Sequence, residues 1–255
     1  MQSKSVSQIK FFEPASATAQ ATQGLLDIDE PNFDFRLIDD QQTVSLAQPQ
    51  THFGFVLRGE VGVGIDQRAY PLCSGMHFVV PAGADNAGKV DLRIDGSVIV
   101  VSQSNYQGLF RIGGPIEKKG RLQYIDGCSD TLLIPPVVKG DPCLNLLKIP
   151  PDTNQTFHVH PSFRFGVIVS GNGFCDWPGG THVLHPGSVF YIPSDGEHRF
   201  RTRSDALSVI AFHPESDFGP EDDNHPMVNK TIVNGVSASQ LSYQERKIVA
   251  DKDPS

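Results

Sequence analysis

The chain has 255 residues, which is enough for one large domain or for two small ones with separate cores. Hydrophobic residues make up 38% and charged residues 20%, as in ordinary soluble globular proteins. The formal net charge of −8 argues against nucleic acid as a partner. No secretory signal and no run of ~18 apolar residues is present, so we expect no membrane partner and a cytoplasmic location.

The predicted elements are mostly short strands. Residues 1–34 are polar and mixed, and we expect an N-terminal arm or an added edge strand there. From Phe35 onward, short runs rich in Val, Ile and Phe alternate with Gly and Pro, which is typical of strands and turns. These runs predict strands near 53–59, 76–83, 97–102, 165–171, 188–194 and 207–213. A helical pattern appears only at 241–252, so we expect an all-β sandwich or barrel fold with a short C-terminal helix.

The strand-rich region repeats itself. A shift of 112 residues aligns its two halves without a gap, so that Phe53 meets Phe165 and Gly59 meets Gly171. The further matches at this offset are Leu72 with Leu184, Gly75 with Gly187, Phe78 with Phe190 and Pro81 with Pro193. An ungapped repeat that keeps its turn residues indicates two similar all-β units in tandem. Residues 103–150 are expected to connect the units and to lend strands to both.

Three histidines of the second unit fall in a recognisable pattern. The pattern consists of His158, His160, Arg164 and Gly171, followed by Gly187, Pro193 and His198. It resembles the cupin superfamily, whose first motif is HxH followed by Glu and Gly, and whose second motif is G, five residues, PxGxxH. The glycine after the proline is displaced to Gly196, with Asp195 in its place.

The resemblance implies a fold and a division of the chain. The expected fold is all-β, with tandem jelly-roll cupin barrels (a bicupin) and a short C-terminal helix. The N-terminal arm would occupy 1–34 and the first barrel, without metal, 35–113. The second, metal-binding barrel would occupy 114–213, and a C-terminal loop and helix 214–255.

The resemblance also implies one divalent metal ion on His158, His160 and His198. Alternate residues of a strand point to one face, so His158 and His160 would project into the barrel together. His198, on a later strand, would complete the set. Three imidazoles suit Fe(II), Mn, Ni, Cu or Zn, and we favour Fe(II).

The first unit carries other residues at the positions equivalent to this set. At the offset of 112 these residues are Leu46, Gln48, His52 and Asn86, in the places of His158, His160, Arg164 and His198. A single imidazole does not make a metal site. We therefore expect the first unit to have lost its metal.

Arg164 stands where the cupin pattern has its carboxylate ligand. Arginine stays protonated and cannot bind a metal, so the ligand set would be three neutral histidines. This resembles three-His cupin oxygenases, such as the thiol dioxygenase and diketone dioxygenase families. Arg164 requires an anion, either a substrate carboxylate held by its guanidinium fork or an internal acid. The internal candidates are Asp176, Asp195 and Glu197.

This interpretation of the sequence leaves three candidate functions. The first is a mononuclear Fe(II) oxygenase of dioxygenase type for a small anionic substrate oriented by Arg164. The second is a metal-dependent isomerase, epimerase or lyase, whose acid or base would be Tyr191, Glu197 or His213. The third is a bicupin that binds a small molecule without turnover. Arg164 and His213 are the candidate catalytic residues. The sequence leaves open whether the chain forms a homodimer.

Overall fold

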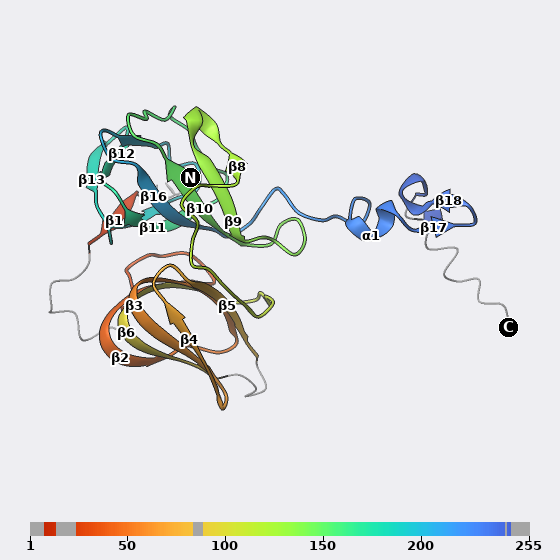
Figure 1. Cartoon of the computed structure of the whole chain (residues 1–255), viewed down its shortest axis with the longest axis horizontal. Coiled ribbons are helices and arrows are strands. Elements are labelled where there is room, and N and C mark those ends of the chain that lie inside the picture. Colours follow the sequence, from red (N-terminus) through yellow and green to blue (C-terminus); the bar gives the residue numbers. More distant parts are fainter. Residues whose placement is uncertain (1–7, 14–23, 84–88, 243, 246–255) are drawn as a thin grey trace, which may run out of the picture. The chain divides into compact units, whose positions relative to one another are not determined.

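The computed structural model describes residues 8–13, 24–83, 89–242 and 244–245. The contacts divide the chain into two compact units: Met1–Ile134 with Leu144–His213, and Pro135–Cys143 with Pro214–Ser255. The first unit consists of antiparallel strands (Figure 1), which confirms the predicted all-β fold.

The first half of the chain forms a six-stranded sheet with the order β2-β6-β3-β5-β7, in which β4 pairs with β3. Its strands are β2 (Phe33–Ser45), β3 (Gln50–Ile65), β4 (Arg68–Cys73), β5 (His77–Ala82), β6 (Val90–Gln103) and β7 (Arg111–Gly113). The interior of this half is an apolar cluster that includes Ile38, Val56, Phe78 and Val100. Residues on the opposite faces of these strands join a different cluster, because side chains alternate along a strand.

The second half forms a seven-stranded sheet with the order β1-β14-β11-β16-β10-β9-β8 and a three-stranded sheet with the order β13-β12-β15. The large sheet contains β1 (Lys10–Phe12), β8 (Leu122–Gln123), β9 (Ser129–Ile134), β10 (Cys143–Ile149), β11 (Arg164–Ser170), β14 (Val189–Ile192) and β16 (Leu207–His213). The small sheet contains β12 (Gly173–Trp177), β13 (Gly180–Leu184) and β15 (Arg199–Thr202). β1 lies at a sheet edge, as one of the two sequence alternatives for the N-terminal arm proposed.

The strand register repeats at the offset of 112 found in the sequence. Gly54 pairs with Phe78 between β3 and β5, and Gly166 pairs with Phe190 between β11 and β14. Both glycines make room for the opposite ring. A Cβ atom would lie 2.1 Å from the Phe78 ring at Gly54 and 2.4 Å from the Phe190 ring at Gly166. The sequence repeat is therefore a structural repeat.

The repeat extends to a glycine five residues after each of Gly54 and Gly166, namely Gly59 within β3 and Gly171 directly after β11. Gly59 and Gly171 both have positive φ angles, 71° and 84°, and a β-bulge lies just before each of them. Such backbone angles favour glycine over residues that carry a Cβ atom. The two halves thus share this local backbone geometry. The assignment of two separate barrel domains with the stated boundaries stays a prediction.

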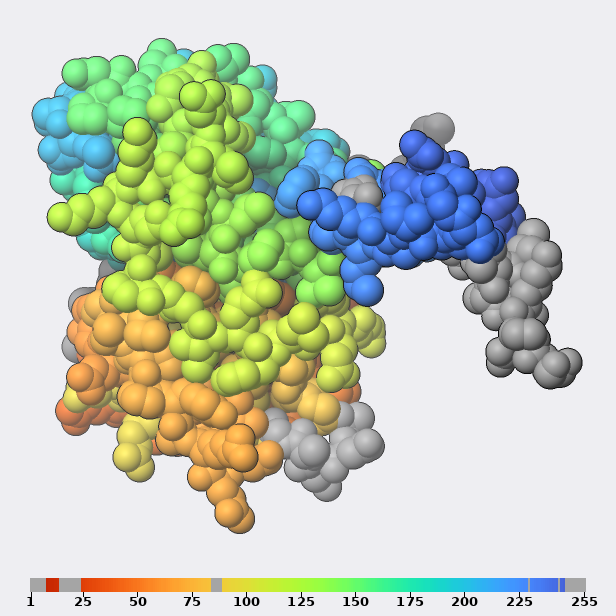
Figure 2. All heavy atoms as spheres, turned by 45° about the vertical axis from the view of Figure 1, so that its right-hand side comes forward, coloured from red at the N-terminus to blue at the C-terminus, as the bar shows by residue number. Residues whose placement is uncertain are grey.

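The connecting residues lend strands to both halves, as predicted. β7 pairs with β5 of the first half, whereas β9 and β10 pair with each other in the second-half sheet. Figure 2 shows the yellow-green connecting residues lying over both the orange first half and the green second half.

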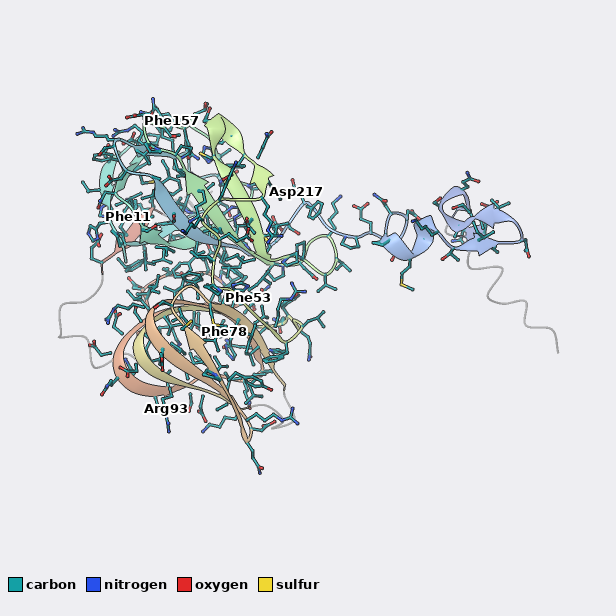
Figure 3. The ribbon with its side chains drawn as sticks, viewed as in Figure 1. Phe11, Phe53, Phe78, Arg93, Phe157 and Asp217 are labelled. Atoms are coloured by element: carbon teal, nitrogen blue, oxygen red, sulfur yellow. The ribbon has the colours of Figure 1, made fainter. Side chains whose placement is uncertain are left out.

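One apolar cluster contains residues from both halves. Phe35 lies 4.8 Å from Phe165, and Phe53 lies 5.0 Å from Phe212, measured between ring centroids. In Figure 3, Phe53 lies on the side of the first half that faces the second half, whereas Phe78 lies within the first-half sheet. This shared core joins the two halves into one compact unit.

The second unit contains short elements only: α1 (Pro226–Asn229), β17 (Ile232–Val233), β18 (Val236–Ser237) and η2 (Ala238–Gln240). A one-turn 3₁₀ element, η1 (Ile125–Gly127), belongs to the first unit. The helix predicted at 241–252 lies mostly outside the described residues. Among the described residues, no helix is long and apolar enough to span a membrane.

Candidate metal centre

Three histidines converge in the second half. His158, His160 and His198 offer ligand atoms that all lie within 4.8 Å of one another. The ring centroids are 4.5 Å apart for His158 and His198, 5.0 Å for His158 and His160, and 5.4 Å for His160 and His198. The expected convergence is confirmed, and metal binding by these residues stays a prediction.

The backbone around His158 differs from the regular strand expected there. His158 and His198 form an isolated antiparallel bridge, and each N–H donates to the carbonyl of the other residue at 3.0 Å. Val159, between the two histidines of the HxH motif, is 52% exposed and points away from them. The alternation of side chains is therefore preserved without a continuous strand.

The turn before His198 explains how the displaced motif glycine is tolerated. Asp195, at the glycine position, has a φ angle of 58°. Aspartate is one of the few residues besides glycine that adopt this left-handed conformation readily. Its N–H donates to the carbonyl of His160 at 2.8 Å, so the turn also anchors the HxH segment.

Hydrogen bonds orient two of the rings. Nδ1 of His158 lies 2.8 Å from the carbonyl of Thr156, and Nδ1 of His198 lies 2.8 Å from the carbonyl of Gly196. A carbonyl can only accept, so each Nδ1 carries the proton and each Nε2 keeps its lone pair for a metal. This donor set fits a divalent ion.

Burial keeps His160 and His198 uncharged. It is the largest cause that lowers the pKa of His160 to about 3 and that of His198 to about 4, and the nearby Arg164 charge acts in the same direction. Both imidazoles are therefore neutral at pH 7, which is the form that binds metals.

Arg164 lies on the same interior face as the histidines. It pairs with Ile192 across β11 and β14, and the Ile192 side chain belongs to the interior cluster of the second half. Paired residues of antiparallel strands share a face, so the half-buried Arg164 also points inward. Its Nη1 donates to the carbonyl and hydroxyl of Ser162, at 3.0 and 2.8 Å, and to the carbonyl of Phe163 at 2.9 Å.

The three internal acids proposed as partners of Arg164 have other surroundings. The Asp176 carboxylate accepts hydrogen bonds from Nε of Arg199 at 3.0 Å and Nε of Arg201 at 2.5 Å. Asp195 and Glu197 are exposed. The anionic partner of Arg164 therefore stays a prediction.

Of the three acid or base candidates, His213 lies beside the triad. It ends β16, and its ring centroid is 6.4 Å from that of His160. Burial lowers its pKa well below the usual value for histidine, with smaller effects from Arg164 and His160. Tyr191 belongs to the cluster shared by the two halves and donates a hydrogen bond to Glu30, and Glu197 is exposed.

Sequence reasoning missed the contribution of the connecting strands. The carboxylate of Asp126, in η1, accepts a hydrogen bond from the N–H of Thr156 at 2.7 Å, and Thr156 in turn holds His158. Asp130 and Asn145, on β9 and β10, also face the interior of the second half. No motif marks these residues in the sequence.

The residues of the first half that are equivalent to the three histidines and Arg164 have different surroundings. Leu46 is 4% exposed within the apolar core. His52 is fully buried, and its Nδ1 lies 2.8 Å from the Ser102 hydroxyl. Burial lowers the pKa of His52 to about 4. Asn86 lies outside the described residues, and the absence of metal from this half stays a prediction.

The sequence was compared with models of known protein families. Residues 145–213 match the family model of the cupin domain. The matched residues include the three histidines, Arg164 and His213. No curated protein matches the chain significantly.

Solved structures share the fold at low sequence identity. A cupin 2 conserved barrel domain protein from Leptotrichia buccalis has a TM-score of 0.56 at 11% identity, covering 84% of this chain and 92% of that one. The protein Ylba from E. coli has a TM-score of 0.59 at 12% identity, covering 82% and 92%. Salicylate 1,2-dioxygenase from Pseudaminobacter salicylatoxidans has a TM-score of 0.52 at 12% identity, covering 70% of both chains. These likenesses show a cupin barrel fold.

Proposed function

We propose that the chain is a mononuclear metal-dependent cupin enzyme that oxygenates a small anionic substrate, with Fe(II) as its metal. The observation that carries this proposal is the convergence of three imidazoles beside an inward-facing arginine. His158, His160 and His198 would hold the ion. A bound divalent ion would supply Lewis-acid or redox chemistry and offer open positions to small ligands.

Arg164 would bind and orient the substrate. A guanidinium fork matches a carboxylate with two parallel hydrogen bonds, and it keeps its charge at any physiological pH. Three neutral histidines leave the positive charge of the ion uncompensated, which also favours an anionic ligand. Both features support a small carboxylic acid as the substrate.

The test combines metal analysis with oxygen consumption. Purified protein would be assayed with a panel of small acids, beginning with 2-hydroxybenzoate because a salicylate dioxygenase shares the fold. We expect about one iron per chain and oxygen uptake that requires both iron and acid. Metal-dependent turnover without oxygen uptake would contradict the oxygenase proposal. The His160→Ala variant is the control, because it removes a ligand.

His213 favours a second candidate, a metal-dependent isomerase, epimerase or lyase without oxygen chemistry. Its ring lies beside His160 and provides an uncharged base near the proposed ion. This function predicts exchange of a substrate proton with deuterated solvent, and loss of that exchange in His213→Gln. Binding of acids without turnover or exchange would instead indicate a non-catalytic binding protein.

The expectations that the chain forms a homodimer and that it is located in the cytoplasm stay predictions.

A further inference from the structure

Two polar side chains of the connecting strands face the interior of the second half. Asp130 on β9 pairs with Leu147 on β10, and Asn145 lies two residues before Leu147 on the same strand. Paired residues and alternate residues share one face of a sheet. Leu147 packs against the interior apolar cluster of the second half, so Asp130 and Asn145 face that interior too.

The Tyr124 side chain, which is 38% exposed, lies near both Asp130 and Arg164. Burial is the main cause that raises the pKa of the Tyr124 phenol, and the Arg164 and Asp130 charges act on it in opposite directions. Arg164 and Asp130 thus both lie within electrostatic range of one phenol group. Cys128 and Asp126 are the other titratable groups that act on Tyr124. A cation and a carboxyl group therefore both lie near the Tyr124 phenol, and both face the interior of the second half.

One acceptor of this pair, Oδ1 of Asn145, has no donor among the described residues. Asn145 is 8% exposed, and its buried Oδ1 has no hydrogen-bond partner among the described residues. Its Nδ2 lies 3.5 Å from Oδ2 of Asp130, which is a long contact. Buried acceptors without a donor are costly, and native proteins rarely leave them so without a reason.

We propose that Asp130 and Asn145 accept hydrogen bonds from a hydroxyl or amino group of the substrate. The substrate is then a small acid with two different polar groups: a carboxylate for Arg164 and a hydrogen-bond donor for Asp130 and Asn145. This inference rests on the proposed function, because it needs Arg164 to hold the carboxylate. It adds a substrate class that Arg164 alone does not define.

The experiment uses matched acids with and without a donor. Calorimetry on the metal-loaded full chain would compare glycine with acetate, β-alanine with propionate, and 4-aminobutyrate with butyrate, since the three lengths sample three distances between a carboxylate and an amino group. We expect the amino acid of at least one pair to bind roughly tenfold more tightly than its partner, which corresponds to one charge-assisted hydrogen bond. The Asp130→Asn variant, which keeps the side-chain shape, should lose this advantage.

Two controls separate this effect from others. An amino acid can also chelate the ion, but an advantage from chelation would survive Asp130→Asn. Asp205→Asn changes an exposed carboxylate that accepts a hydrogen bond from Asn172, and it should leave all six affinities unchanged. Metal content and thermal midpoint would verify that each variant is folded and loaded.

The pH dependence of amino-acid binding tests the role of Asp130 without a variant. Burial raises the pKa of Asp130 to about 6. The amino-acid advantage should therefore be full at pH 7.5 and fall towards pH 5.5, because a protonated carboxyl group no longer attracts an ammonium group. The alkanoates should not show this loss.

The outcomes distinguish the inference from the proposed function. If the alkanoates bind but no amino acid gains an advantage that depends on Asp130, the substrate class is wrong and the proposed function stands. If none of the six acids binds to the metal-loaded protein, both are wrong.

Discussion

His158 and His198 exchange two backbone hydrogen bonds, each N–H donating to the carbonyl of the other residue at 3.0 Å. This bridge joins the HxH segment to the turn before β15 and brings the two ring centroids to 4.5 Å. The geometry of the triad is thus set by the backbone as well as by side-chain packing. Removing one imidazole should leave that backbone arrangement in place.

The His160→Ala variant tests the proposed metal ligands. Because His160 makes no backbone bridge with His198, the variant should fold normally but lose most of its metal, with affinity reduced roughly 100-fold or more. Elemental analysis and thermal unfolding would measure both properties. His182→Ala removes a histidine that pairs with Glu13 instead, and it should keep its metal. A full equivalent of metal in His160→Ala would refute the assignment.

Asp126→Asn tests a residue that positions His158, a proposed metal ligand. Its carboxylate holds the N–H of Thr156 at 2.7 Å, and the carbonyl of Thr156 holds Nδ1 of His158. A weaker hold on this segment should lower metal affinity by about tenfold while leaving the ligand set complete. Competition with a chelator would measure the affinity, and Asp205→Asn serves as the matched control. Unchanged affinity would mean that Thr156 is held without Asp126.

The three histidines could be predicted because a sequence motif records them. HxH fixes two side chains on one face, and the second motif fixes the distance along the chain to His198. The structural repeat was predictable for a similar reason, since glycines such as Gly54 and Gly166 are required by close ring contacts. Requirements of this kind can be recognised in a single sequence.

Asp130 and Asn145 could not be predicted in this way. Their inward orientation depends on the pairing of β9 with β10, including a register shift beside Asn145. A single-residue change of register would turn a side chain to the other face. The role of Asp126 likewise depends on its contact with Thr156, thirty residues away in sequence. Tertiary contacts, which no local pattern records, determine these roles.

Gly54→Ala tests the packing that underlies the repeat. A Cβ atom there would lie 2.1 Å from the buried Phe78 ring, so either the ring or the strand must move. We expect a loss of about 1–3 kcal/mol in the free energy of unfolding. Gly62→Ala, on the same strand, would place its nearest neighbour at 3.7 Å and should change stability by less than about 1 kcal/mol. Equal unfolding midpoints in urea for the two variants would contradict this packing argument.

Asp176→Asn tests the ion pairs of β12 and β15. The carboxylate, whose side chain is 8% exposed, contacts Arg199 and Arg201, and Arg201 is the main cause that lowers its pKa. We expect a loss of roughly 1–3 kcal/mol at pH 7, limited because both arginines are partly exposed. A lowered pKa gives stability that is full above the ordinary value of 3.8 and is lost as pH falls further. Urea unfolding should show Asp176→Asn less stable than the unchanged protein at pH 7, with a smaller difference at pH 3, whereas Asp205→Asn should show no such difference at either pH.

Arg164→Lys distinguishes a substrate-binding role from a structural one. Lysine keeps the charge but loses the planar fork, so binding of a substrate carboxylate should weaken and KM should rise by about tenfold or more. Metal content should stay the same, because Arg164 is not a ligand. Nη1 also donates to Ser162 and Phe163, so a structural role would instead lower the thermal midpoint and leave KM unchanged in the folded protein. Steady-state kinetics, metal analysis and thermal unfolding of one preparation would separate the two roles, with Arg203→Lys, an exposed arginine, as the control.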